Sequence, residues 1–495
     1  YPMPIKLRKN TQKTAKMLSF IKRERMIFMK EKDIKKELHI FAKELQSKLN
    51  SETLQMIGEK HSFSRRKSKF QTAELVALCV WLSQQVATTS LTQLSSLLEV
   101  QTGISITAEA LNQRFNHSAV MTLKEIFSSL LSSEFKNPIF NCLNENFPFK
   151  RLRLLDSTTF QLPDMFSSSY RGFGGSSHTA GIKIQLEYDL FNGQFLNIYA
   201  GAGSKNDKTY GSECLESIQK EDLCIRDLGY FDLKDLYMIE KQGAFFVSRI
   251  KLNTRIYTKN STPKTCINGE IKKYSMYKLL DLEAIMNKLK PGETIEIESV
   301  YCGNCQKLPA RLICYRLTEE QLKNRRKKQI FTAKKKGFEL KEKSKHLSGL
   351  NVYITNISSE CIKKEKIHNL YSLRWQIELL FKTWKSLFGI QHCKKIKKER
   401  LECHLYGQLI SILISSTTMF KIRKLLYEKD GEELSEYKGI YVVKAYLTSL
   451  YEALKKSTQR ISEILFRLFN FLRKNGRKSH RYEKKTAIDI LSTLC

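Results

Sequence analysis

The spacing of hydrophobic and polar positions changes twice along this 495-residue chain. Between residue 29 and about residue 145, apolar residues recur at helical spacing, for example over 33–49 and 72–87. From residue 150, short alternating or apolar runs bounded by turn residues replace them, and after residue 389 the helical spacing returns. Because helices repeat every 3.6 residues and strands every two, the pattern predicts helical ends around a strand-containing middle.

The strand-like runs of the middle occur in an informative order. Residues 151–156 alternate, and two further strands over 181–191 and 194–200 are joined by Asn192-Gly193, which predicts a type I′ hairpin. A short apolar strand over 223–227 follows, then a helix and another strand over 244–250. Three antiparallel strands followed by a crossover predict the opening of a ribonuclease-H-like α/β fold.

Beyond residue 250 the chain reads as a β-rich insertion with a very basic segment, Lys323–Lys345, before one more strand. Met29 is a plausible natural start, so the residues before it read as a non-native or disordered basic arm. The predicted organisation is an arm (1–28), a helical DNA-binding region (29–145), the first part of the catalytic core (146–250), the insertion (251–350), the end of the core (351–400) and a helical region with a basic tail (401–495).

The run from Tyr371 to Lys385 contains no Gly or Pro and predicts one amphipathic helix. At about 100° per residue, Tyr371, Arg374, Glu378 and Lys385 share one narrow face, opposite a broad apolar back. Lys382 joins that face, and Trp375 flanks it. Charged faces of this kind are common on surface helices, so the spacing alone also fits an ordinary solvated helix.

Two aspartates give this helix a possible chemical role. Asp156 and Asp227 each end an apolar strand, and adjacent strands would bring both carboxylates to one sheet edge, where Glu378 could join them. Three carboxylates repel one another unless divalent cations bind between them, and Mg²⁺ favours such oxygen ligands. Rival acids nearby are Asp164, Asp189, Asp207, Asp222 and Asp232.

The charge balance limits the classes of binding partner that fit this chain. With 85 Lys and Arg against 50 Asp and Glu, the formal net charge is +35, which favours a polyanion, nucleic acid before anionic membrane. No stretch reaches the roughly 18 apolar residues that span a bilayer, and 405–420 reads as a buried core helix. The twelve cysteines show no framework spacing, which fits a reducing cytoplasm.

The spacing Tyr371-x2-Arg374-x3-Glu378-x6-Lys385 resembles the Y-(2)-R-(3)-E-(6)-K signature of bacterial insertion-sequence transposases of the DDE class, insertion sequence family four. The segments around Asp156 and Asp227 look like that family's two Asp motifs. The resemblance implies an Asp156-Asp227-Glu378 triad that binds Mg²⁺, with Mn²⁺ able to substitute. DNA contacts implied or inferred beside it are Tyr371, Arg374, Trp375, Lys382, Lys385 and, for a flipped base, Tyr353.

On this resemblance the expected function is cut-and-paste DNA transposition through hairpin ends. The expected partners are double-stranded terminal inverted repeats and target DNA, bound by a homodimer in a synaptic complex, with no membrane partner. The expected location is the bacterial cytoplasm, at the nucleoid. Two alternatives stay open: a DNA-binding protein without catalysis, and a plain metal-dependent nuclease that releases DNA ends without joining them.

Overall fold

A computed structural model describes residues 29–64, 69–83, 85–132, 148–173, 179–251, 253–268, 270–337, 339, 347–478 and 486–493. The chain forms two compact units, both discontinuous in sequence. The helical unit takes its described residues from Tyr1–Cys142 and Lys382–Glu483, and the sheet unit from Leu143–Phe381 and Lys484–Cys495. Each unit is therefore built from two segments that are far apart in the sequence.

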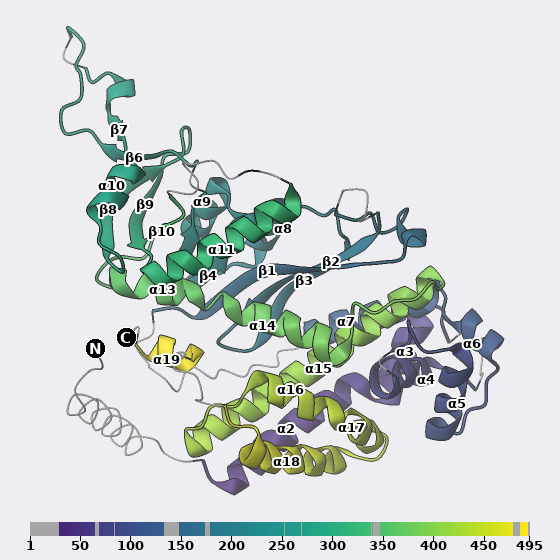
Figure 1. The fold of residues 1–495 in the computed structure, drawn as a ribbon. Helices are drawn as coiled ribbons and strands as arrows, with labels where there is room; N and C mark the ends of the chain where they lie inside the picture. Colours follow the sequence, from purple (N-terminus) through teal and green to yellow (C-terminus); the bar gives the residue numbers. More distant parts are fainter. Residues whose placement is uncertain are drawn as a thin grey trace. The chain divides into compact units, whose positions relative to one another are not determined.

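The helical unit contains only helices among its described elements (Figure 1). In chain order these are α2 (Glu31–Leu49), α3 (Ser51–Lys60), α4 (Thr72–Val76), the π-helix η1 (Ala77–Leu82), α5 (Leu91–Thr102), α6 (Ala108–Arg114), α7 (His117–Leu131), the π-helix η7 (Trp384–Phe388), α15 (Lys398–Asp430), α16 (Glu436–Ala445), α17 (Leu447–Leu454) and α18 (Thr458–Asn475).

The centre of the helical unit is α15, which packs against α7 and η1. Most of α15 is apolar or carries small hydroxyl side chains, and 405–420 is buried apart from Tyr406, which confirms the expected core helix. In α18 the apolar residues Ile461, Leu465 and Leu472 recur at helical spacing and are buried, and α18 packs against α2. Each fully buried Leu or Ile side chain contributes roughly 1.5–3 kcal/mol of transfer free energy.

The sheet unit combines one ten-stranded sheet, in its described part, with helices. Its strands are β1 (Arg151–Gln161), β2 (Gly181–Asp189), β3 (Gln194–Ala202), β4 (Asp222–Arg226), β5 (Phe245–Arg249), β6 (Ile256–Lys259), β7 (Tyr277–Leu279), β8 (Thr294–Cys302), β9 (Leu308–Arg316) and β10 (Leu350–Thr355). Its α-helices are α8 (Asp207–Glu213), α9 (Leu233–Lys241), α10 (Leu282–Lys288), α11 (Glu319–Lys336), α13 (Lys364–Ser372), α14 (Trp375–Thr383), whose last two residues are grouped with the helical unit, and α19 (Ala487–Ser492). Short 3₁₀ turns are η3 (Asp164–Phe166), η4 (Cys214–Ser217), η5 (Leu228–Tyr230) and η6 (Lys273–Ser275).

The strand order is β3-β2-β1-β4-β5-β10-β9-β8-β6-β7. β1, β2 and β3 are antiparallel, whereas β4 runs parallel to β1 and β5 parallel to β4. The strand after the insertion, β10, pairs antiparallel with β5, so the insertion extends the same sheet. These strands and helices confirm the mixed α/β fold.

Side-chain alternation along the strands separates the two faces of the sheet. Val352 and Ile354 of β10 join a buried cluster with Leu236 and Ile239 of α9. Tyr353, between them in sequence, points the other way and contacts Tyr371 of α13. α9 and α13 therefore cover opposite faces of this part of the sheet.

Two local predictions need correction. The β2–β3 connection is a four-residue loop with Gly193 at φ +69°, and no positive φ occurs at Asn192, so it is not a type I′ turn. The Asp189 carboxylate holds that loop by accepting from the backbone N–H of Phe191 at 3.0 Å. The basic segment after residue 318 is helical over α11, and its residues 338 and 340–346 lie outside the described part.

The predicted continuous helix over 371–385 is also wrong. α13 ends at Ser372, α14 begins at Trp375, and the segment from Trp384 is π-helical. At the junction, Arg374 N–H donates to Tyr371 O at 3.1 Å and Gln376 N–H donates to Leu373 O at 2.9 Å. These i→i−3 bonds tighten the backbone locally, so the path stays helical while the regular turn is interrupted.

Two expectations fall partly or wholly on residues that the structure leaves undescribed. The arm over 1–28 lies outside the described residues, as do 479–485 of the basic tail. None of the described helices combines the length and the apolar content needed to cross a bilayer.

Candidate functional site

Three separate elements of the sheet unit carry Asp156, Asp227 and Glu378. Asp227 directly follows β4, as expected, and its Oδ2 accepts from Gly229 N–H at 3.1 Å. Asp156 does not end its strand, because β1 continues to Gln161 by pairing with β2. It does sit just past the parallel pairing with β4, whose last pair is Leu155 with Arg226. Glu378 lies in the first turn of α14.

The guanidinium of Arg374 joins all three carboxylates. Its Nη1 lies 2.6 Å from Asp156 Oδ2 and 3.6 Å from Asp227 Oδ1, and its Nη2 lies 2.6 Å from Glu378 Oε1. Arg374 belongs to the tight junction between α13 and α14, which carries its side chain to the end of β4. The three predicted acids therefore meet at one sheet edge around one cation.

The exposure of the three carboxylates differs, and with it their electrostatics. The side chain of Asp156 is only 14% exposed, against 40% for Asp227 and 36% for Glu378. Burial raises the pKa of Asp156 to about 7. The hydrogen bond from Ser157 N–H and the charge of Arg374 oppose this rise, whereas the charges of Asp227 and Glu378 add to it. Burial alone would lower the pKa of Arg374, but the negative charges around it, first those of Asp156 and Asp227, raise the pKa by more than burial lowers it.

The two aromatic residues beside this cluster differ in accessibility. Tyr371 is buried, and its hydroxyl donates to the carbonyl oxygen of Arg226, the residue before Asp227, at 3.3 Å. Burial raises the pKa of Tyr371 to about 12, so it stays a neutral donor. Trp375 is 57% exposed, and the guanidinium carbon of Arg374 lies 5.3 Å from its ring centroid. Trp375 therefore presents an open aromatic face next to the carboxylates.

Tyr353 does not fit the expected base-stacking role in this structure. It is 1% exposed, packs against Tyr371 with ring centroids 5.3 Å apart, and its hydroxyl lies 2.7 Å from His368 Nδ1. An aromatic ring packed on the interior of the sheet unit presents no face to a nucleic-acid base. Its place on the central strand β10 explains the burial.

Lys382 and Lys385 follow Glu378 in sequence but are grouped with the helical unit. Lys382 is exposed near the end of α14, and Lys385 is half-buried in the π-helix η7. Burial lowers the pKa of Lys385. Their proposed contacts with DNA remain predictions.

Two further arginines, Arg249 and Arg325, lie beside the aromatic residues and were not anticipated. Arg249 ends β5, and Arg325 of α11 donates to Ser348 O at 2.9 Å and to Asn351 Oδ1 at 2.8 Å. The Nε of Arg249 is buried without a hydrogen-bond partner, and within the described ranges no carboxylate pairs with either guanidinium.

The two guanidiniums influence each other and their surroundings. Burial lowers the pKa of Arg325, and the charge of Arg249 lowers it further. Burial and both arginines also lower the pKa of His368. Cations gathered without a carboxylate favour an anion at this position. The sequence alone shows only that Arg249 lies near the end of a predicted strand, and the pairing of that strand with β4 emerges on folding.

The rival acids have structural partners of their own. Asp222 pairs with Arg151 and Arg153, and Asp232 caps α9 while pairing with Lys208 at 2.8 Å. The fully buried Asp189 accepts from Leu152 N–H at 3.2 Å. Asp207 lies closest to the cluster, 3.5 Å from Ser157 Oγ, but Lys183 pairs with it at 3.2 Å. Asp164 accepts from Thr179.

The donor set of the three carboxylates suits a hard divalent cation, which takes oxygen ligands. In this structure Arg374 separates the carboxylates, and among the described residues no three His, Cys, Asp or Glu side chains are grouped closely enough to hold a metal ion. The residues fit such an ion chemically once the guanidinium turns away.

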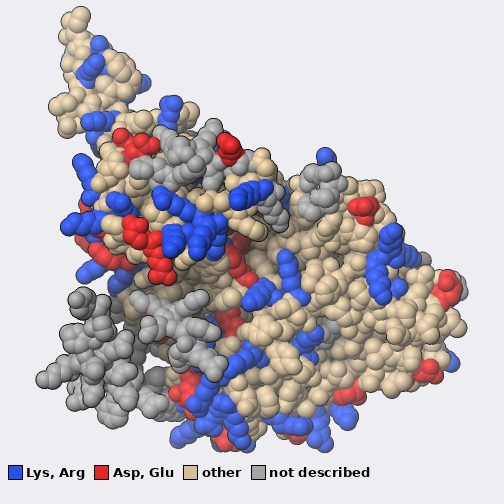
Figure 2. Space-filling model, viewed as in Figure 1, with Lys and Arg blue, Asp and Glu red and all other residues tan. Residues whose placement is uncertain are grey.

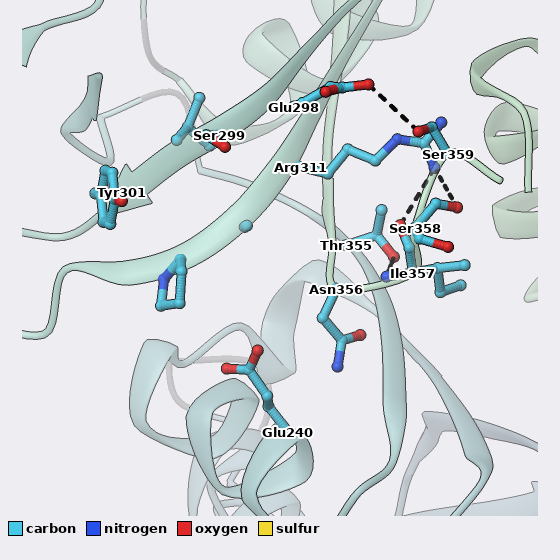
Figure 3. A pocket seen from close by; sticks show the side chains of 13 residues that line it. Glu240, Glu298, Ser299, Tyr301, Arg311, Thr355, Asn356, Ile357, Ser358 and Ser359 are labelled. Carbon is cyan, nitrogen blue, oxygen red and sulfur yellow. Dashed lines mark hydrogen bonds between the residues drawn. The ribbon is translucent and has the colours of Figure 1, made fainter. Parts of the chain in front are cut away.

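A separate pocket of about 380 Å³ opens near the end of β10 (Figure 3). Arg311 reaches along it and donates to the carbonyl oxygens of Ile357, Ser358 and Ile362, while Ser359 donates to Glu298 at 3.3 Å. Because β5 and β10 are antiparallel, this end of β10 lies at the start of β5, away from Asp227. The hydrogen bonds of Arg311 hold the turn after β10, so we assign this pocket a structural role.

Comparisons with known proteins identify the family of this chain. Residues 147–414 match the family described as Transposase DDE domain. The chain is 50% identical over 461 residues to the transposase for insertion sequence element IS231B of Bacillus thuringiensis subsp. berliner, covering 93% of this chain and 96% of the relative. It is 35% identical over 460 residues to the transposase for insertion sequence element IS1151 of Clostridium perfringens, covering 93% and 97%.

Among solved structures, a piggyBac transposase synaptic complex with hairpin DNA covers 87% of this chain and 83% of that chain. Its TM-score of 0.39 and identity of 11% are too low to support a structural argument. The sequence matches carry the assignment, because they extend over more than half of the chain for the family and nearly all of it for the relatives. The chain therefore belongs to the DDE transposases of insertion sequences.

Proposed function

We propose that this transposase carries out cut-and-paste transposition with Asp156, Asp227 and Glu378 as its catalytic triad. The observation that carries this proposal is the meeting of the three acids, which are far apart in sequence, around the single guanidinium of Arg374. The strand order β3-β2-β1-β4-β5, with β4 and β5 parallel to β1, supports a ribonuclease-H-like core.

The triad would hold Mg²⁺, for which Mn²⁺ could substitute. Held by these carboxylates, such ions would supply the Lewis acidity that activates an attacking hydroxyl and stabilises the leaving oxygen of a phosphoryl transfer. Arg374, released from the carboxylates, then has a phosphate as its new partner, because a guanidinium binds phosphate oxygens through two parallel hydrogen bonds. This exchange keeps the local charge balanced.

The neighbouring side chains would position the DNA. Trp375 is exposed and aromatic, so it can stack on an unpaired base at a distorted DNA end. Tyr371 is a neutral donor that holds the backbone before Asp227, while Lys382 and Lys385 supply cations for phosphates. Arg249 and Arg325 add an anion site beside Tyr353, which packs against Tyr371.

The reaction sequence implied by the family signature has four phosphoryl transfers at each end. Water cleaves one strand at the element's end and leaves a 3′-hydroxyl. That hydroxyl attacks the opposite strand, which forms a hairpin and releases the flanking DNA. Water reopens the hairpin, and the restored 3′-hydroxyl attacks target DNA. Each step exchanges one phosphodiester oxygen for another, so the chemistry needs no oxidant or energy-rich cofactor.

Two copies of the chain would pair two terminal repeats in a synaptic complex, and the reaction would take place at the nucleoid in the bacterial cytoplasm. The helical region over 29–145 would help to bind the repeats. In it, α5 and α6 flank Gly103 at φ +73°, which gives the spacing of a helix-turn-helix.

The direct test replaces each acid by its amide. Asp156→Asn, Asp227→Asn and Glu378→Gln should each lower cleavage of element ends at least about a thousandfold with Mg²⁺ while retaining end binding, because only the negative charge is lost. Asp164→Asn and Glu240→Gln serve as matched controls and should cut normally. A triad variant that still cleaves would remove that residue from the mechanism.

Product analysis separates the remaining alternatives. Joined target DNA supports transposition, whereas free ends without hairpins or joining would identify a plain nuclease. Binding without any nick by the wild type would identify a DNA-binding protein that lacks catalysis.

A further inference from the structure

The helix α11 is unusual among the described helices because it is long, well capped and barely buried. At its start Thr318 accepts from Gln321 N–H and Gln321 caps in return, and at its end Gly337 adopts φ +64°. Of its described side chains, only Ala333 is buried. The caps specify a helix over 18 residues that adds almost nothing to the core.

One side of α11 attaches to the sheet unit through Arg325, whose guanidinium bonds to Ser348 and Asn351. Asn351 lies on β10, the strand that also carries Tyr353 against Tyr371. The buried Ala333, eight residues on, lies about 80° around the helix from Arg325, at the margin of the attached side. The attachment therefore ties α11 to the strand next to the candidate site.

The opposite side of α11 begins with Glu319 and Glu320 in the first turn and, from Lys323 onward, carries only cations around an apolar centre. At about 100° per residue, the exposed Lys323, Lys327 and Lys334 lie roughly opposite Arg325, and the exposed Arg326 lies at the edge of this side. Ile330 lies among them at 51% exposure, and Phe331 beside them is 72% exposed. Figure 2 shows Lys and Arg side chains gathered over α11.

The charge pattern distinguishes this face from an ordinary solvated one. A solvated helix face usually alternates charges, so that acids and bases pair at i,i+4. Glu319 stands four residues before Lys323, but none of the four cations forms an ion pair with another described residue. Beyond the first turn α11 contains no acid, and Lys323 and Lys327 repel at i,i+4. Like charges without counter-charges favour an external polyanion.

We propose that this outer face of α11 binds the sugar-phosphate backbone of duplex DNA beside the catalytic site. From Lys323 to Lys334 the helix rises roughly 16 Å, which spans several phosphates of one strand. Cations contact the phosphates and Ile330 and Phe331 contact sugars, so the binding is independent of base sequence. The proposal rests on the proposed function, because duplex DNA is the substrate of that reaction.

The test combines Lys323→Ala, Arg326→Ala, Lys327→Ala and Lys334→Ala. Alanine favours helix, so α11 remains formed. A control protein carries four exposed lysines of the same unit changed in the same way: Lys234→Ala, Lys241→Ala, Lys288→Ala and Lys290→Ala. Both variants lose four positive charges, so they differ only in where the charge is removed.

Affinity is measured by fluorescence anisotropy on a terminal-repeat duplex and on an unrelated duplex across a range of salt concentrations. The α11 variant should bind both duplexes at least ~10-fold more weakly near physiological salt, and its slope of log affinity against log salt should be smaller by about 3. The control should stay within ~2-fold of the wild type. An unchanged slope in the α11 variant, or a loss confined to the terminal repeat, would overturn the proposal.

Cleavage at low salt separates this proposal from the proposed function. Once binding is saturated, the α11 variant should nick element ends at the wild-type rate, because its triad is intact. If the wild type nicks nothing while the salt slopes still differ between the two variants, the proposed function fails and the α11 surface stands.

Discussion

At the scale of single residues, the charge of Arg374 decides how the candidate site is built. Asp156 and Glu378 each lie 2.6 Å from its guanidinium, and Asp227 lies 3.6 Å away. Three carboxylates gathered without a cation would repel one another. Arg374 therefore stabilises the protein without bound metal or DNA, and in the proposed reaction it also binds a DNA phosphate.

Replacing Arg374 tests that stabilising role. Arg374→Ala should lower the free energy of unfolding by about 2 kcal/mol, less than the 3–5 kcal/mol of fully buried pairs because Asp227 and Glu378 are partly exposed. Thermal unfolding measures the loss, and added Mg²⁺ should restore more stability to the variant than to the wild type. The exposed Arg255→Ala is the control. A variant as stable as the wild type without Mg²⁺ would contradict this role.

His404 of α15 supplies a second prediction at the residue scale. It is 1% exposed, and neither ring nitrogen has a hydrogen-bond partner among the described residues. Burial lowers the pKa of His404 to about 3. The unfolded chain then binds one more proton than the folded chain between about pH 6.5 and pH 3, so acid destabilises the fold through this residue.

The free energy of unfolding should therefore fall by about 2 kcal/mol between pH 6.5 and pH 4.5 because of His404 alone. Denaturant unfolding at several pH values measures this fall. In His404→Leu the fall should be smaller by that amount, whereas the exposed His117→Gln should behave as the wild type. An unaltered pH dependence in His404→Leu would show that the ring is not the acid-sensitive group.

At the scale of elements, interruptions of regular helices position Arg374 in the candidate site and shape the packing of the helical unit. The break between α13 and α14 turns Arg374 toward β1 and β4, and the π-helix η1 sits against α15. A π-helix leaves carbonyl groups with altered partners, and Ser411 of α15 donates to Val80 O of η1 at 2.7 Å. One turn earlier, Gly407 faces the same π-helix.

Gly407 shows how close these two helices approach. A Cβ at this position would lie 2.6 Å from the carbonyl oxygen of Cys79. Gly407→Ala should therefore destabilise the protein by about 2 kcal/mol, opposite to the gain of roughly 1 kcal/mol that Ala gives in an open helix. Thermal unfolding checks the sign, with Ser128→Ala on the exposed face of α7 as the comparison. A more stable Gly407→Ala protein would refute the close contact.

At the scale of the whole molecule, the discontinuous helical unit has consequences for folding. Residues before 142 supply α2, α7 and η1, whereas their partners α15 and α18 come after residue 382. The apolar side chains of α7, including Leu123 and Ile126, are buried in this unit. Without the C-terminal helices these surfaces would face water.

A fragment of residues 29–142 should therefore lack fixed tertiary structure by itself. Near-ultraviolet circular dichroism and amide dispersion in NMR spectra should resemble those of an unfolded or aggregated chain. Adding residues 382–478 should restore dispersed signals, because α15 and α18 then cover the exposed faces. A well-dispersed spectrum of the short fragment alone would show that its helices pack without their partners.

Spacing and composition determined much about this protein without tertiary information. Alternation predicted the strands, and the triad acids were chosen from residue type and position, because local sequence encodes periodicity and chemical capacity directly. The motif Tyr371-x2-Arg374-x3-Glu378 also led to the transposase family, which the relatives confirm.

Only the tertiary structure decided which side chains meet and which are hidden. Asp156 lies inside β1 because β2 extends that strand, a pairing between residues far apart in sequence. Tyr353 is buried because β10 is central in the sheet, and Arg249 gains its importance from strands that come together only on folding. Burial and charge pairing arise from such long-range contacts, so no local pattern encodes them.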